Sequence, residues 1–176
     1  DIRTILLKDC TNSTTAALTL YPQLSFSSTS STADKGMQLC GFGGIAGWIR
    51  NSASYTFTNC DNAGTITLSA LKITNSKGNS PRSISVGGIL GLAAPCNAGL
   101  MRDPSASDYP EVYNVRLENC DNDGTIYNYG VNYSSRGETN NKVFTGGIAG
   151  SLAGTSGAKA NVISCSNTGD IITHDY

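Results

Sequence analysis

Two short stretches, GGIAG at residues 43–47 and NCDNAGTI at residues 59–66, decide the interpretation of this chain, because both of them recur. The glycine block returns as GGILG at 87–91 and GGIAG at 146–150, and the cysteine block returns as NCDNDGTI at 119–126 and SCSNTGDI at 164–171. In each case the glycine block comes first. Recurrence in a constant order is typical of repeat proteins, in which similar units stack on one another.

A weaker copy of the cysteine block opens the chain, where Cys10 lies in KDCTN and the strand-like LTL follows at 18–20. No glycine block precedes it in this sequence. We therefore divide a single domain, 1–176, into a partial unit at about 1–40 and three full units. The full units cover about 41–85, 86–145 and 146–176.

Alternating side chains indicate strands within each unit. Tyr55, Phe57 and Asn59 would lie on one face of a strand, with threonines on the other. The same inner positions hold Val115 and Leu117, Ala160 and Val162, and Ile5 and Leu7 in the other units. The Asn-x-Gly element that follows predicts a turn, in which Gly64, Gly124 and Gly169 would take positive φ.

These patterns predict an all-β fold with three strands per unit: one through the glycine block, one ending at the cysteine, and one beginning at Thr-Ile. A single unit cannot bury its apolar face alone, so stacking is required. We expect a parallel β-solenoid, or β-helix, of about three and a half three-strand coils. Right-handed coiling is the expectation, because parallel crossovers are almost always right-handed.

Composition narrows the function classes. Twelve basic and thirteen acidic residues give a net charge of −1 and are scattered, so no basic face suggests nucleic acid as a partner. Only 14% of residues are charged, while glycine reaches 20 and serine, threonine and asparagine are abundant. No stretch approaches the roughly 18 apolar residues of a transmembrane segment. The sequence predicts an extracellular or cell-surface protein.

The glycine blocks and their Cys-Asn-x-Gly-Ile partners resemble the GLUG motif, a repeat of bacterial surface proteins that include adhesin-like proteins. The resemblance covers most of the chain beyond about Cys40. It implies a β-solenoid displayed at the cell surface, for adhesion or as a structural element.

Six cysteines fall into two groups. Cys10, Cys60, Cys120 and Cys165 occupy one repeated position, so stacking would place them about 4.8 Å apart as a structural ladder of small buried residues. A disulfide between stacked neighbours stays open on geometry. Cys40 and Cys96 flank successive glycine blocks, and a disulfide between them would fasten the long insertion. We expect no metal site, because ligands in a row do not converge on an ion.

The sequence holds few candidates for chemistry. Asp121, Asn122, Asp123 and Gly124 look like the first half of a calcium loop, but the far bidentate Glu is missing, which favours a turn. His174 is the one histidine, and no nucleophile, zinc or phosphate motif is present. Acidic residues gather in the long insertion, at Asp103, Asp108 and Glu111. We expect no enzyme and no cofactor.

Aromatic residues mark the candidate binding face. Where the second unit has Thr67 and Ser69, the third has Tyr127 and Tyr129, with Tyr133 following at the same parity. The insertion at 93–113 adds three further candidates: Arg102, Tyr109 and Tyr113. Tyrosine is also an ordinary β-surface residue, and both interpretations stand.

Three functions follow as hypotheses. The first is a non-enzymatic module of a bacterial surface protein, for adhesion or as a stalk, with a host glycan or surface protein as partner. The second is a self-assembling subunit of an extracellular filament, which would contact its own copies through the solenoid ends. The third is a carbohydrate-active enzyme built on a β-helix.

Overall fold

The computed structural model describes residues 3–20, 23–25, 38–49, 53–69, 71–74, 82–93, 114–129, 131–133, 142–152 and 159–174. Every secondary-structure element in these ranges is a β-strand. Every pairing between those strands is parallel. The expected all-β, parallel fold is therefore confirmed. No helix in the described part of the chain is long and apolar enough to cross a membrane.

The strands form six parallel sheets, and each sheet takes one strand from each successive repeat. Three sheets follow the cysteine block: β1 (Arg3–Lys8), β7 (Ala53–Thr58), β13 (Asn114–Glu118) and β19 (Lys159–Ile163); β2 (Thr11–Asn12), β8 (Asp61–Asn62), β14 (Asp121–Asn122) and β20 (Ser166–Asn167); and β3 (Ala17–Leu20), β9 (Thr65–Leu68), β15 (Ile126–Asn128) and β21 (Ile171–Thr173). Two sheets follow the glycine block: β5 (Gln38–Gly43), β11 (Arg82–Gly87) and β17 (Lys142–Gly146); and β6 (Ala46–Ile49), β12 (Leu90–Ala93) and β18 (Ala149–Leu152). The sixth contains β4 (Gln23–Ser25), β10 (Leu71–Thr74) and β16 (Val131–Tyr133).

The strand register matches the repeats seen in the sequence. Gly87 pairs with Gly43 on one side and Gly146 on the other. Each repeat has more strands than expected, however. The repeat from β5 to β10 has six short strands where the sequence analysis predicted three, because the glycine block bends into two strands and β8 and β10 are additional.

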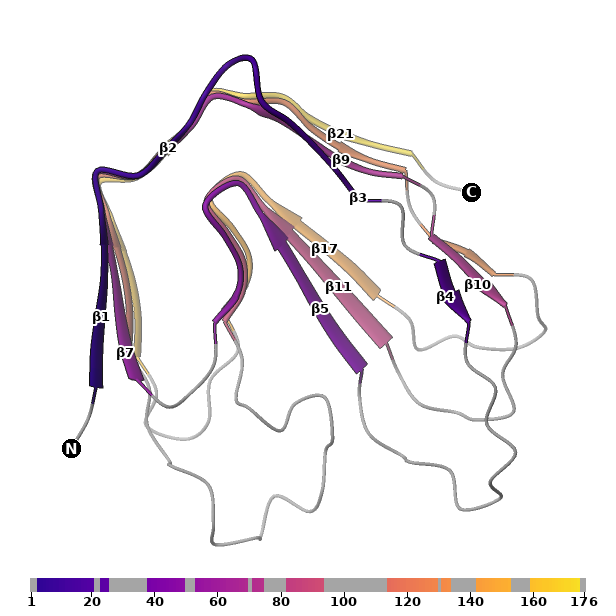
Figure 1. The fold of residues 1–176 in the computed structure, drawn as a ribbon, viewed down its shortest axis with the longest axis horizontal. Helices are drawn as coiled ribbons and strands as arrows, with labels where there is room; N and C mark the ends of the chain where they lie inside the picture. Colours follow the sequence, from indigo (N-terminus) through magenta and orange to yellow (C-terminus); the bar gives the residue numbers. More distant parts are fainter. Residues whose placement is uncertain are drawn as a thin grey trace, which may run out of the picture.

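Each repeat that contains a glycine block has two nested arches (Figure 1). The outer arch runs through the three strands of the cysteine block, for example β7, β8 and β9, and the inner arch runs through the two strands of the glycine block, β5 and β6. Figure 1 shows the bend of the inner arch lying inside the bend of the outer arch. Successive repeats superimpose in this view because every strand pairs with its counterpart in the next repeat.

Two apolar clusters fill the space between the outer and inner arches. One cluster includes Phe57, Leu117 and Ile89, and the other includes Ile66, Ile126 and Val86, all of them fully buried. Burial of one such side chain contributes about 1.5–3 kcal/mol. At the two ends of the stack, equivalent positions are exposed: the first and last repeats leave Ile5, Val162 and Ile171 between 41% and 50% accessible.

The residue before each cysteine breaks the strand alternation. Asp9, Asn59, Asn119 and Ser164 all have φ between 50° and 54°, in the left-handed region that Asn and Asp tolerate best. The expectation that Asn59 continues the inner face with Tyr55 and Phe57 is wrong, because this kink turns Asn59 to solvent. The same kink points Cys60 into the core.

Candidate functional site

The most extended polar feature of the structure is a row of asparagines, the asparagine ladder, formed by Asn12, Asn62, Asn122 and Asn167. Each Nδ2 donates a hydrogen bond to the Oδ1 of the next asparagine, and all three bonds are 2.6 Å long. The short strands β2, β8, β14 and β20 position these side chains, since they pair in register. The ladder links all four repeats through side chains alone.

The last three amides each donate a hydrogen bond to the carbonyl oxygen of the glycine two residues later: Asn62 to Gly64 at 3.1 Å, Asn122 to Gly124 at 3.0 Å and Asn167 to Gly169 at 2.8 Å. In Asn62 and Asn122 this bond uses the second Nδ2 hydrogen, because the first is donated along the ladder. Asn62 and Asn122 are almost completely buried. A buried amide is tolerated when its donors and acceptor have partners, so this stack favours one register of the repeats.

The glycine block packs directly against the asparagine ladder. A Cβ built on Gly44, Gly88 or Gly147 would lie 2.3–2.7 Å from side-chain atoms of Asn62, Asn122 or Asn167, respectively. Any side chain at these positions would collide with the amide opposite. The two sequence blocks are therefore structural partners within one repeat, which explains why they recur together.

The remaining glycines of the block also provide space. A Cβ on Gly43 would lie 2.4 Å from the Ala46 carbonyl oxygen at the bend, and one on Gly91 would lie 2.1 Å from the Phe42 nitrogen. The backbones of β5 and of β12 in the next inner arch thus approach each other closely. Close approach, rather than backbone conformation, also explains the turn glycines: none of Gly64, Gly124 and Gly169 has a left-handed φ. The expectation of positive φ at these three residues is wrong.

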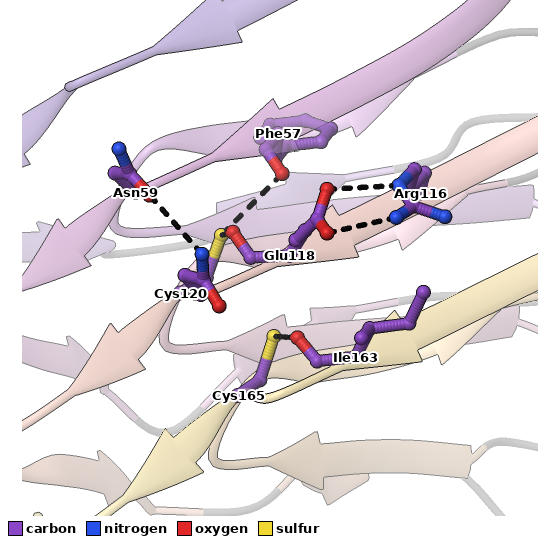
Figure 2. A network of polar contacts seen from close by, with 8 residues as sticks. Phe57, Asn59, Arg116, Glu118, Cys120, Ile163 and Cys165 are labelled. Carbon is purple, nitrogen blue, oxygen red and sulfur yellow. Dashed lines mark hydrogen bonds and ion pairs between the residues drawn. The ribbon is translucent and has the colours of Figure 1, made fainter.

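Four of the six cysteines occupy equivalent places beside the ladder. Cys60 and Cys120 are fully buried in the core, while Cys10 and Cys165 pack against it at the two ends. All four are free thiols. The single S–H of Cys120 has two acceptors within reach, the carbonyl oxygens of Glu118 and Phe57, which lie 3.4 Å and 3.7 Å from Sγ (Figure 2).

Burial changes the ionisation of these thiols. Desolvation raises the pKa of Cys120 to about 11 and is the largest cause of the raised pKa of Cys60. A thiol that stays protonated is a poor nucleophile and a poor metal ligand. The buried thiols of Cys60 and Cys120 are therefore suited to packing in the core.

The carboxylates of the calcium-like segment bind the next repeat. Asp121 Oδ1 accepts hydrogen bonds from the Ser166 nitrogen at 3.1 Å and from its hydroxyl at 2.6 Å, and Asp123 accepts one from the Thr168 hydroxyl. Asn122, between them, belongs to the ladder. These groups hold neighbouring repeats together.

An ion pair lies on the outer face of β13. Arg116 donates two hydrogen bonds to the Glu118 carboxylate, at 2.8 Å and 3.0 Å, and Figure 2 shows the two side chains side by side. The hydrogen bonds from Arg116 lower the pKa of Glu118. Exposed pairs of this kind contribute little to stability.

The aromatic candidates form a row with a third member. The rings of Tyr127 and Tyr129 lie 6.3 Å apart between centroids, with planes 9° apart. His174, from the last repeat, stacks on Tyr129 at 4.9 Å with planes 3° apart. The register partners of Tyr127 are Thr67 in the preceding repeat and Ile172 in the next.

For two other predicted residues the structure describes the backbone position. Tyr133 lies in β16, paired with Ile73, and Cys40 lies in β5, paired with Ile84. Cys96, Arg102, Tyr109 and Tyr113 lie outside the described residues, as do the acidic residues Asp103, Asp108 and Glu111. The Cys40–Cys96 disulfide therefore stays a prediction.

Sequence reasoning missed the asparagine ladder and the place of His174. Both carried a signal: Asn62, Asn122 and Asn167 hold one repeated position, and His174 holds the position of Tyr129 in the next repeat. Comparison of the chain with protein-family models, with curated proteins and with solved structures finds no match.

Proposed function

We propose that the chain is a right-handed β-solenoid of about three and a half turns that serves as a non-enzymatic structural module, a stalk, of an extracellular bacterial surface protein. The asparagine ladder carries this proposal. It runs through all four repeats, and its two central amides, Asn62 and Asn122, are buried, donate two hydrogen bonds each and accept one. The amide groups of these asparagines bind one another and are not available to bind a ligand; they hold one repeat on the next.

The other repeated polar groups support the same function. Neighbouring repeats are joined on the outer surface by a bond of 3.0 Å from Asn59 Nδ2 to Asp9 Oδ1, and on the inside by the buried cysteine thiols. Loads applied to such a column are shared by many parallel bonds. A module of this type is suited to holding a binding surface away from a cell.

Single-molecule pulling tests the stalk function. The chain, held between two marker domains, should unfold in one high-force step, and Asn122→Ala should lower that force while Asn161→Ala, on an exposed strand position, should not. Unfolding by gradual extension at low force would argue against a stalk. So would cleavage of a polysaccharide by the purified chain that is lost in Asp103→Asn or Glu111→Gln.

Adhesion is a second candidate, supported by the stacked row of Tyr127, Tyr129 and His174. Aromatic faces pack against the apolar faces of sugars, and the register partner of Tyr127 in the preceding repeat is the short Thr67. Binding of the chain to a glycan array should be lost in the Tyr127→Ala, Tyr129→Ala double variant. The matched control is Thr19→Ala, in the same column of the first repeat. Equal glycan binding by both variants would exclude this face.

A further inference from the structure

Two of the four stacked cysteines, Cys10 and Cys60, lie against the same strand, β1. Cys10 Sγ is 3.6 Å from the Lys8 carbonyl oxygen, and Cys60 Sγ is 3.5 Å from the Leu7 carbonyl oxygen. The equivalent contact of Cys120 with the preceding repeat is longer, at 3.7 Å. The sulfur of Cys60 therefore lies at the boundary between its own repeat and the repeat that contains Cys10.

The backbone holds these two cysteines at the spacing of neighbouring strands. Lys8 pairs with Thr58 just before them, and Thr11 pairs with Asp61 just after them. Between these pairs, the Asp61 nitrogen donates a hydrogen bond of 2.9 Å to the Cys10 carbonyl oxygen. Paired strands lie about 4.7–4.9 Å apart, and the Cα atoms of cysteines in a disulfide are usually about 4.4–6.8 Å apart. The backbone spacing therefore fits a disulfide.

Rotation of one side chain brings the two sulfurs together. Cys10 and Cys60 have the same orientation, because each Sγ lies close to the carbonyl oxygen two residues earlier in its own chain segment, at 3.6 Å and 3.5 Å. Sulfurs in equal orientation are separated by about the strand spacing. Both cysteines lie between two strands rather than within one, so a change in χ1 of one of them leaves the strands in place.

The two thiols also interact with each other. Desolvation is the largest cause of the raised pKa of Cys60, and the Cys10 side chain adds to it by charge and by hydrogen bonding. Desolvation is likewise the largest cause of the raised pKa of Cys120, but there the Cys60 thiol adds to it by charge alone. Cys60 is fully buried, so cysteines of other chains do not reach it. These observations make Cys10 the partner of Cys60.

We propose that Cys10 and Cys60 form a disulfide that joins the first repeat to the second when the chain folds in an oxidising compartment. The oxidant is a low-molecular-weight disulfide. One cysteine thiolate attacks it and releases one thiol, and the other cysteine then displaces the second, so the protein loses two hydrogens with their electrons and the oxidant is reduced to two thiols. The compartment rests on the proposed extracellular function, whereas the pairing rests on the contacts of the two cysteines.

The disulfide adds a covalent link to a junction that hydrogen bonds and apolar packing otherwise hold. It closes a long loop in the unfolded chain, which lowers the entropy of the unfolded state and stabilises the folded one. Reduction returns Cys10 and Cys60 to packed thiols.

Oxidative refolding of the full chain tests the pairing. The reduced, unfolded chain is refolded in a buffer of reduced and oxidised glutathione, and the linked peptides are identified by mass spectrometry after digestion. Cys10–Cys60 should be the main link among the four stacked cysteines. The linked chain should melt about 5 °C or more above the reduced chain. The proposal is overturned if Cys10 and Cys60 stay unlinked, or if the link lowers the melting temperature.

Cys10→Ser is the matched control, because it removes one partner at a half-buried position and leaves Cys60 in the core. In this variant Cys60 should stay a free thiol. A Cys60–Cys120 link that forms as readily as Cys10–Cys60 does in the native chain would overturn the proposal. A negative result leaves the stalk function standing, since that function is tested by pulling and does not require a covalent link.

Discussion

The Nδ2 of Asn62 donates a hydrogen bond of 2.6 Å to the Oδ1 of Asn122 in the repeat above it, and both side chains are sealed from solvent. The two residues are far apart in sequence and meet only when the repeats are stacked in one register. A shift of one residue between repeats would leave both buried amides without partners, at a cost of about 1–3 kcal/mol for each unsatisfied group. The pair therefore favours a single register between the two repeats.

Replacement of Asn122 by alanine should destabilise the fold strongly. The change removes the acceptor of Asn62 Nδ2 and the donor to the Gly124 carbonyl oxygen, both in a buried environment. We expect a loss of about 3 kcal/mol or more in the free energy of unfolding, measured by urea denaturation. Asn167→Ala is the control: its side chain is exposed, water replaces the lost bonds, and the loss should be about 1 kcal/mol. Similar losses of stability in both variants would contradict the claim that the buried Asn62–Asn122 hydrogen bond fixes the register.

Two glycine-to-alanine substitutions should differ in their effect. A Cβ on Gly88 would lie 2.1 Å from the Gly147 carbonyl oxygen and 2.4 Å from Asn122 Cγ, whereas one on Gly47 has a single close contact, 2.8 Å from the Gly41 carbonyl oxygen. Gly88→Ala should therefore cost about 3 kcal/mol or prevent folding, and Gly47→Ala about 1 kcal/mol. Circular dichroism with thermal melting measures both. The reverse order of stabilities would show that the inner arch does not pack against the ladder.

The buried Cys120 thiol predicts a fall in stability at alkaline pH. Its pKa is about 11 in the folded chain, against 9.0 for an exposed thiol. Between these values the unfolded thiol is ionised and the folded one is not, so the unfolded state binds fewer protons and stability falls as pH rises. Within this window, the free energy of unfolding falls by up to about 1.4 kcal/mol for each pH unit. Urea denaturation at pH 8, 9 and 10 should show a steeper fall in the native chain than in Cys120→Ala, and parallel slopes would refute the shift.

Thiol labelling should separate the interior from the ends. Cys60 and Cys120 are fully buried, while Cys10 and Cys165 are half-buried at the two ends of the stack. With iodoacetamide at neutral pH, mass spectrometry should find Cys10 and Cys165 modified well before the other two. Addition of urea should bring all four to the same rate. Early modification of Cys120 in the native chain would be inconsistent with the packing described here.

Much of the fold could be predicted from the residues that recur in the sequence. The order of the blocks predicted the parallel stacking, and the inner positions Phe57 and Leu117 were predicted from alternation, because strand geometry fixes a period of two. The kink at Asn59 escaped prediction, since one residue in the left-handed region reverses that period locally. Alternation also could not show that GGIAG bends, because its glycines have no side chains to alternate.

The candidate site was predicted less well. The rings of Tyr127 and Tyr129, which the sequence singled out, lie next to each other, but the stacking of His174 depends on the register of the last repeat. The partnership of Gly88 with Asn122 depends on two arches meeting across the interior, which no local pattern encodes. Long-range packing decided both features.

Hydrogen exchange of the asparagine side-chain amides tests the stacked ladder most directly. In NMR spectra of the folded chain, the Nδ2 hydrogens of Asn62 and Asn122 should exchange far more slowly than those of Asn161, which is exposed. Asn12 and Asn167, at the ends, should be intermediate. Exchange of Asn62 and Asn122 at the rate of Asn161 would contradict the ladder and the register of repeats that it holds.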